Sequence, residues 1–164
     1  MKIKINEKSR VEELNKILQE IGKQQCLIGI PEGKASRDTG VKINNATIGY
    51  INEFGSDRMH IPARPHLIPG VKKSHSKIAS IMEAFLKKKL SFKGGDIRKT
   101  LEACGLVASA SVKTLMQEGL HPALAQSTIK ARQRQTQGDH SGDIPLINTG
   151  NYLAHITYVV TRKK

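Results

Sequence analysis

Two long stretches of the chain carry apolar residues at helical spacing, and this pattern restricts the possible folds more than any other feature of the sequence. The first spans about residues 71–90 and the second about residues 96–118. Their apolar stripes are Ile78, Ile81, Met82, Phe85, Leu86 and Leu90, and Ile97, Leu101, Cys104, Ala108, Val112 and Leu115. Residues 92–95 connect the two stretches, and Asp96 is a suitable N-cap. We therefore expect two helices that pack as an antiparallel hairpin against a sheet.

Shorter elements are predicted around this hairpin. An N-terminal helix begins at Ser9, with Glu12 completing a capping box. Its apolar stripe consists of Val11, Leu14, Ile17, Leu18 and Ile21, and Gly22 ends it. Residues 46–54 form a short helix. Residues 25–30 and 156–161 have high β-propensity and are expected to pair.

Together these elements predict an α+β fold, a small antiparallel β-sheet flanked by the N-terminal helix and the helical hairpin. The length of 164 residues suits a single domain over residues 1–164. Two polar stretches without periodicity, 31–45 and 133–143, are expected to be flexible loops. Between them, Ser127 or Thr128 is expected to cap one short helical turn.

Positive charge is the strongest feature of the composition. The chain has 27 Lys and Arg residues against 14 Asp and Glu, a formal net charge of +13, which favours polyanions or an acidic protein as partners. The charge is dense on the hairpin, where the candidate DNA-facing residues are Lys72, Lys73, Lys87, Lys88, Lys89 and Lys93. Such a surface suits contact with the DNA backbone without reading of the sequence. The alternative is a solvated helix face that has no partner.

No residue pattern typical of an enzyme or a metal site stands out. The six histidines and the two cysteines lack metal-ligand spacing, and Cys26 and Cys104 each lie in an apolar pattern that predicts a buried free thiol. Glu53 lies in a sharply patterned segment, where an ion pair with Arg58 or Arg64 is favoured over a role as general base. We therefore expect no catalysis, metal or cofactor, and neither a secretion signal nor a membrane segment.

Three segments with proline and glycine at fixed positions resemble a known family. They are residues 45–55 (Asn-Ala-Thr-Ile-Gly-Tyr-Ile-Asn-Glu-Phe-Gly), 61–67 (Ile-Pro-Ala-Arg-Pro-His-Leu) and 144–153 (Ile-Pro-Leu-Ile-Asn-Thr-Gly-Asn-Tyr-Leu). Their content and order are similar to the tail-completion and neck proteins of long-tailed bacteriophages and prophages, the "virion morphogenesis" group. The resemblance extends from about Cys26 to Val160. The sequence departs from the family at His66, where Phe is usual, and at Gly49, where Ala is common.

The resemblance implies a structural protein that completes the phage tail or joins it to the head connector, as a ring that is often six-fold. The implied partners are further copies of the chain, a connector or stopper protein, a tail-tube or tail-terminator protein, and genomic DNA in the lumen. The implied location is the virion, after assembly in the cytoplasm of the bacterial host. The alternatives are a tail terminator or another minor tail protein, and, from a different class, a sequence-independent DNA-binding protein.

The motif residues are expected to have structural roles. They are Glu53, Phe54, Gly55, Pro62, Arg64, Pro65, Pro145, Leu146, Thr149 and Gly150. Phe54 is expected to be buried where a short helix ends, with Gly55 at positive φ. The two prolines around Arg64 stiffen an extended arm that directs this side chain towards a carboxylate. The third motif forms a turn, capped by Thr149, before the last strand.

Overall fold

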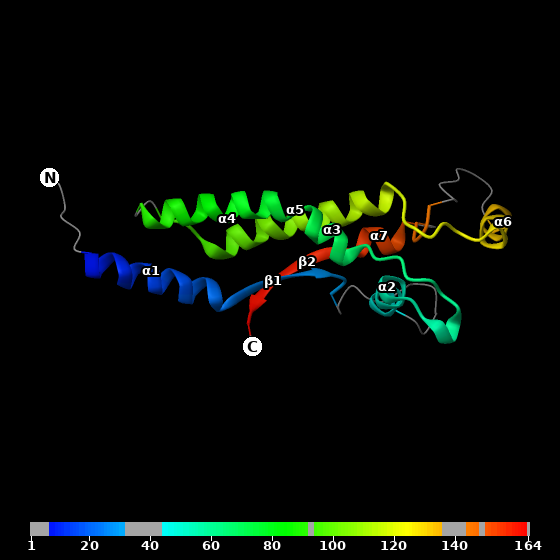
Figure 1. Cartoon of the computed structure of the whole chain (residues 1–164), viewed down its shortest axis with the longest axis horizontal. Helices are drawn as coiled ribbons and strands as arrows, with labels where there is room; N and C mark the ends of the chain where they lie inside the picture. Colours follow the sequence, from blue (N-terminus) through cyan, green and yellow to red (C-terminus); the bar gives the residue numbers. More distant parts are fainter. Residues whose placement is uncertain (1–6, 32–43, 92–93, 136–143, 148–149, 164) are drawn as a thin grey trace.

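The computed structural model describes residues 7–31, 44–91, 94–135, 144–147 and 150–163. The molecule is elongated, with α1 at one end and α6 at the other (Figure 1). In chain order the elements are α1 (Glu7–Gly22), β1 (Gln24–Gly29), α2 (Asn45–Phe54), the 3-10 helix η2 (Asp57–Met59), α3 (Leu67–Lys73), α4 (His75–Leu90), α5 (Ile97–Gln117), α6 (Gln126–Gln135), α7 (Asn151–His155) and β2 (Thr157–Arg162).

A two-stranded antiparallel sheet connects the N-terminal and C-terminal parts of the chain. β1 pairs with β2 in a register that places Cys26 opposite Val160. This confirms the α+β class and the predicted strand pairing. α5 packs closely on one face of the sheet, because residue 105 is a glycine. A Cβ atom at Gly105 would lie 2.5 Å from the ring of Tyr158 and 2.8 Å from Sγ of Cys26.

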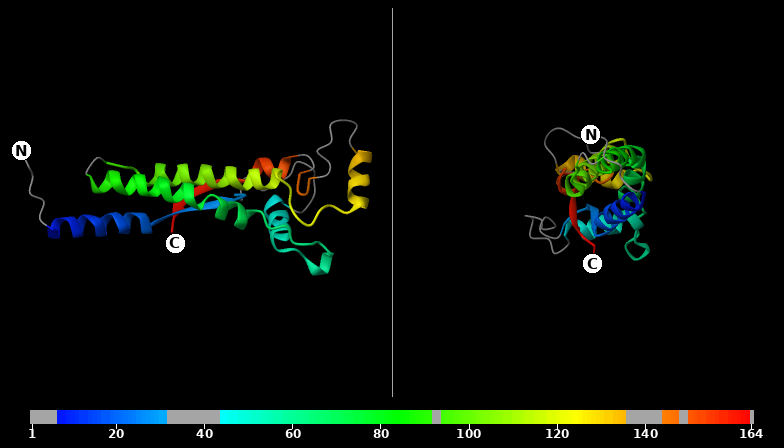
Figure 2. Two further views of the ribbon diagram at one scale, coloured as in Figure 1. Left: turned by 45° about the horizontal axis from the view of Figure 1, so that its top comes forward. Right: turned by 90° about the vertical axis from the view of Figure 1, so that its left-hand side faces the viewer.

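The expected antiparallel hairpin is formed by α4 and α5, which are connected at one end of the molecule and pack along each other (Figures 1 and 2). Asp96 caps α5 as predicted, and its carboxylate accepts the backbone N–H groups of Arg98 and Lys99 at 2.8 and 3.4 Å. A buried apolar cluster between α5, α7 and the start of β2 consists of Val112, Met116, Leu120, Tyr152 and Ile156. α5 is therefore the central element of the fold.

The single helix predicted over residues 71–90 is wrong, because two helices, α3 and α4, meet at Ser74. The Ser74 hydroxyl donates to the carbonyl oxygen of Val71 at 2.7 Å and so competes with the regular backbone bonds of a helix. α3 also begins earlier than predicted, at Leu67. Pro69 lies in its first turn, where a proline has no hydrogen bond to lose.

Two other predicted boundaries differ from the structure. α1 begins at Glu7, so Ser9 lies inside the helix and the predicted capping box is wrong. α6 continues to Gln135, through the start of the loop predicted over 133–143, because Gln and Arg are favourable helix residues. The rest of that predicted loop, and residues 32–43 of the other, lie outside the described residues.

Candidate functional site

The carboxylate of Glu53, near the end of α2, lies against the start of α3. Its two oxygens accept the backbone N–H groups of residues 66–68 at 2.8 to 3.0 Å. N–H groups at a helix start have no partner within the helix, and the positive end of the helix dipole favours a negative charge. The side chain is buried, with 4% exposed. The predicted ion pair of Glu53 with Arg58 or Arg64 is therefore wrong, because backbone donors occupy both oxygens.

His66 is fully buried between this carboxylate and Tyr152. Its Nδ1 lies 2.9 Å from the carbonyl oxygen of Arg64 and 3.2 Å from Oε2 of Glu53. Its Nε2 lies 2.6 Å from the hydroxyl oxygen of Tyr152. Burial lowers the pKa of His66, against the opposing effects of the Arg64 carbonyl and the charge of Glu53. A neutral ring with its proton on Nδ1 satisfies this geometry, because Nε2 then accepts the hydroxyl proton of Tyr152.

Tyr152 connects α7 to this cluster and touches α2 at Gly49. A Cβ atom at residue 49 would lie 2.7 Å from the Tyr152 hydroxyl oxygen. Next to it, Nδ2 of Asn45 donates to Oδ1 of Asn151 at 3.0 Å, which also joins α2 to α7. Burial raises the pKa of Tyr152, so its hydroxyl group remains a donor. Gly49 and His66, which come from two different sequence motifs, thus both lie against this one hydroxyl group.

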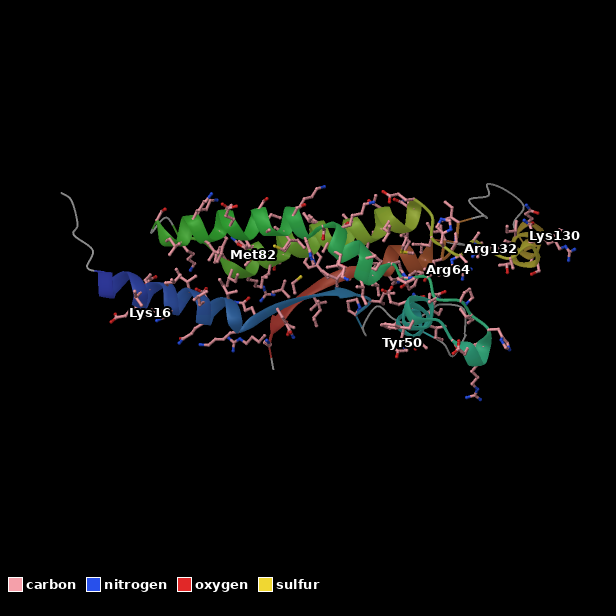
Figure 3. All side chains as sticks on the ribbon, in the orientation of Figure 1. Lys16, Tyr50, Arg64, Met82, Lys130 and Arg132 are labelled. Carbon is pink, nitrogen blue, oxygen red and sulfur yellow. The ribbon has the colours of Figure 1, made fainter. Side chains whose placement is uncertain are left out.

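Arg64 fastens the segment that leads into α6. Its Nε and Nη2 donate to the carbonyl oxygens of residues 122 and 123, at 2.7 and 3.1 Å, and the residue is 8% exposed. The expected carboxylate partner is therefore replaced by two carbonyl groups, which the forked guanidinium binds together. Nη1 of Arg132 in α6 donates to the carbonyl oxygens of residues 144 and 147, at 3.2 and 3.0 Å. Figure 3 shows both arginines towards the end of the molecule that carries α6.

We call Glu53, His66 and Tyr152 the polar clamp. One of its three members comes from each of the three sequence motifs, and all three are at most 6% exposed. The polar clamp therefore fixes α2, α3 and α7 relative to one another and offers a solute little access.

Gly55 directs the chain away from α2 with the predicted positive φ, 78°. A Cβ atom there would lie 2.9 Å from the backbone nitrogen of Ala63.

Other predictions for the first two motifs have mixed outcomes. Phe54 is 60% exposed, so its predicted burial is wrong. Glu53 faces inward, which directs the next residue outward, and the Phe54 ring lies 5.0 Å from that of Tyr50 on the same exposed surface. Pro62 and Pro65 lie, as expected, in a segment that is neither helix nor strand, and both are exposed.

The described residues of the third motif before α7 are 144–147 and 150. Pro145 is buried and Leu146 is half-buried with a φ of 65°, which is unusual for a residue with a side chain. Gly150 also has a positive φ, 72°, and precedes the first residue of α7. Thr149, predicted to cap this turn, lies outside the described residues.

The basic residues of the hairpin do not form one uniform surface. Three of the six candidate lysines pair with carboxylates: Lys73 with Glu118 and Lys87 with Glu83 at 2.6 Å, and Lys89 with Glu20 at 3.2 Å. Lys72 and Lys88 are exposed, and none of the carboxylates in the described ranges forms an ion pair with them. Lys93 lies outside the described residues. The structure thus leaves Lys72 and Lys88 as the stronger candidates for a polyanion.

Both cysteines lie among the residues that the structure describes. Cys26 and Cys104 are free cysteines, Cys26 half-buried and Cys104 buried, and burial raises the pKa of both thiols. Among the residues that the structure describes, no group of three or more His, Cys, Asp or Glu side chains is arranged to hold a metal ion. In the same residues no helix has the length and apolar character needed to cross a membrane.

Two exposed apolar surfaces were not predicted from the sequence. The first, the α1 stripe, consists of Val11, Leu14 and Leu18, which are 58%, 38% and 53% exposed. The second, the outer sheet face, lies opposite α5 and centres on Leu27 and Val159, which are 53% and 41% exposed and pair across the strands. A groove of about 310 Å³ follows this face, lined by Leu27–Pro31, Thr157 and Val159. The helical spacing predicted an apolar stripe on α1, but it could not show which residues of that stripe are exposed.

Comparisons of the chain with protein-family models, with curated proteins and with solved structures find no match. The functional argument therefore depends on the geometry of the polar clamp, the exposed apolar surfaces and the sequence motifs.

Proposed function

We propose that the chain is a structural virion protein of a long-tailed phage or prophage, which completes the tail or joins it to the head connector as a ring. The polar clamp is the observation that carries this proposal. The first two motifs that resemble the phage family are near each other in the sequence, whereas the third, residues 144–153, is far from both. Glu53, His66 and Tyr152 bring all three into one buried cluster. A shared structural task accounts for their occurrence together.

The chemistry of the clamp supports a structural role over a catalytic one. A carboxylate, an imidazole and a phenol are the groups of an acid–base site, but such a site must reach its substrate. Here Glu53 is occupied by three backbone N–H groups, and His66 by a carbonyl oxygen and a hydroxyl group. We therefore assign these residues to holding the fold, and not to a reaction.

The exposed apolar surfaces support assembly into a larger particle. A two-stranded sheet is marginal unless other elements cover it, and here α5 covers one face while Leu27 and Val159 remain exposed on the other. Large apolar side chains that lie together on a surface mark protein–protein contacts. The ring and its neighbours in the neck or tail supply such contacts.

The positive charge has a use in a ring through which a genome passes. Lys72 and Lys88 are the described candidates for contact with the DNA backbone, because Lys73, Lys87 and Lys89 are already paired with carboxylates. Contacts of this kind neutralise phosphates without reading bases.

Negative-stain electron microscopy of the purified chain, with mass by light scattering over a range of protein and salt concentrations, tests the proposal. Closed rings with a central hole are expected. A chain that stays monomeric and binds duplex DNA tightly, with steep salt dependence, would instead favour the sequence-independent DNA-binding protein.

A further inference from the structure

We propose that the α1 stripe of one copy of this chain docks on the outer sheet face of the next copy. The inference deepens the proposed function, on which it rests, by naming the surfaces that join neighbouring subunits of the ring. Such a contact joins two different surfaces and is therefore head-to-tail, the kind of interface that generates rings when the rotation closes.

The α1 stripe is an exposed apolar face of a helix, and such a face suits contact with a partner. Val11, Leu14 and Leu18 are spaced i, i+3 and i+7, so they lie on one side of α1. The helix already uses a neighbouring side for internal contact, because Ile17 is 2% exposed and Glu20 pairs with Lys89 of α4. The exposed stripe is thus additional to the internal packing of α1 and not a substitute for it.

The stripe cannot fold back onto the sheet of its own chain in this arrangement. A single residue, Lys23, separates the end of α1 from the start of β1. Figure 1 shows α1 leading away from the two strands towards one end of the molecule. α1 therefore projects beyond its own sheet, where it is placed to reach another molecule.

The outer sheet face matches α1 in size and in character. A helix of 16 residues is about 24 Å long, and strands of six residues are about 20 Å long. The apolar pair of Leu27 and Val159 lies in the middle of this face, beside the groove of about 310 Å³. One amphipathic helix therefore covers the face along its length.

Charge complementarity selects a second copy as the occupant. α1 has four glutamates against three basic residues, a net charge of −1, in a chain whose formal net charge is +13. At one end of the sheet, a hollow between α1 and β2 is lined by the basic residues Lys16, Lys23, Arg162 and Lys163 and by Glu20, which pairs with Lys89. The other glutamates of a neighbour's α1 are attracted to this basic end, whereas two such basic ends repel each other.

Two double variants test the contact, each designed to preserve its own element. Leu14→Glu with Leu18→Lys removes the stripe but adds a favourable i, i+4 ion pair to α1. Leu27→Lys with Val159→Glu removes the outer sheet face but places opposite charges across the strands. The matched control is Leu106→Glu with Ala110→Lys on α5, at exposed positions with the same spacing. Circular dichroism and urea denaturation establish that each variant is folded.

Mass measured by light scattering gives the decisive result. Each test variant alone is expected to be monomeric under conditions where the wild type and the control assemble. A mixture of the two test variants is expected to form a 1:1 dimer and nothing larger, because it contains one intact stripe and one intact sheet face. A mixture that forms no dimer overturns the inference. A test variant that dimerises on its own also overturns it, because an interface between two α1 helices would survive in Leu27→Lys with Val159→Glu, and one between two sheet faces would survive in Leu14→Glu with Leu18→Lys.

The inference and the proposed function fail in different ways. Test variants that assemble as the wild type does overturn the inference, while the rings that they form support the proposed function. A wild-type chain that stays monomeric at every concentration also overturns the inference, because a second copy is then not the occupant. The proposed function is overturned only if that monomer binds duplex DNA tightly.

Discussion

The hydroxyl oxygen of Tyr152 lies 2.6 Å from Nε2 of His66, and this buried contact joins residues 86 positions apart. Tyr152→Phe leaves Nε2 without its donor in an environment from which water is excluded. We expect the free energy of unfolding to fall by about 1–3 kcal/mol. Urea denaturation followed by circular dichroism measures the change.

A double-mutant cycle with His66→Phe separates this contact from other effects of the two substitutions. His66→Phe leaves the Tyr152 hydroxyl group buried without an acceptor, so it also destabilises the fold. The double variant removes both partners and is expected to lose less stability than the sum of the single losses, with a coupling of about 0.5–3 kcal/mol. Strictly additive losses would mean that the two side chains stabilise the fold independently.

The absence of a side chain at Gly49 leaves the space that the Tyr152 hydroxyl group occupies. In Gly49→Ala the new methyl carbon would lie 2.7 Å from the Tyr152 oxygen, so we expect a loss of about 1–3 kcal/mol in the free energy of unfolding. Tyr152→Phe in the same chain removes the oxygen and should reduce this loss. The matched control is Gly22→Ala at the end of α1, where no atom lies within 4 Å and stability should be unchanged or slightly greater.

Stability is expected to fall below neutral pH because of His66. Burial lowers the pKa of His66 in the folded chain, while in the unfolded chain it returns to about 6.5. As the pH falls through this value, the unfolded state takes up a proton that the folded state does not, so stability decreases by at most about 1.4 kcal/mol per pH unit. Urea denaturation between pH 7.5 and 5.5 measures the slope. His66→Phe should flatten it; an unchanged slope would assign it to other groups.

The sequence predicted the elements of this fold better than their contacts. Helices and strands follow from local patterns, and both strands, α2 and α5 lie within a residue or two of the predicted ranges. The partner of Glu53 was missed because a charge pattern shows which side chains can pair but not which backbone N–H groups are left open in three dimensions. The proline at position 69 was the available signal, since proline favours the first turn of a helix and so indicated that α3 begins near His66.

The α1 stripe shows a second limit of sequence patterns. Periodicity predicted an apolar helix face, but it does not say whether the same chain or another covers that face. In the structure Ile17 is covered while Leu14 and Leu18 are not. Residues within three positions of each other on one apolar stripe can thus be buried or exposed. Only the tertiary arrangement determines which of them are buried.

Arg64 is expected to be irreplaceable by lysine. Its guanidinium spans the carbonyl oxygens of residues 122 and 123, whereas a lysine ammonium is a single point of donation on a flexible stem. Arg64→Lys should therefore cost about 1–3 kcal/mol in the free energy of unfolding. Arg58→Lys, at an exposed position of η2, is the control and should change stability little. Hydrogen exchange in α6 should increase in the first variant alone, because Arg64 fastens the segment that leads into that helix.

The proposed contact with DNA predicts that the unpaired lysines of the hairpin contribute more to duplex binding than the paired ones. Lys72→Gln with Lys88→Gln removes two exposed charges that have no carboxylate partner in the described ranges, and Lys73→Gln with Lys87→Gln removes two that are paired. Both double variants change the net charge equally. We expect the slope of log binding constant against log salt to fall by about two for the first variant and by less for the second, because a nearby carboxylate already neutralises part of the charge of each paired lysine. Equal slopes would show that net charge alone determines binding and that the hairpin has no particular DNA-facing surface.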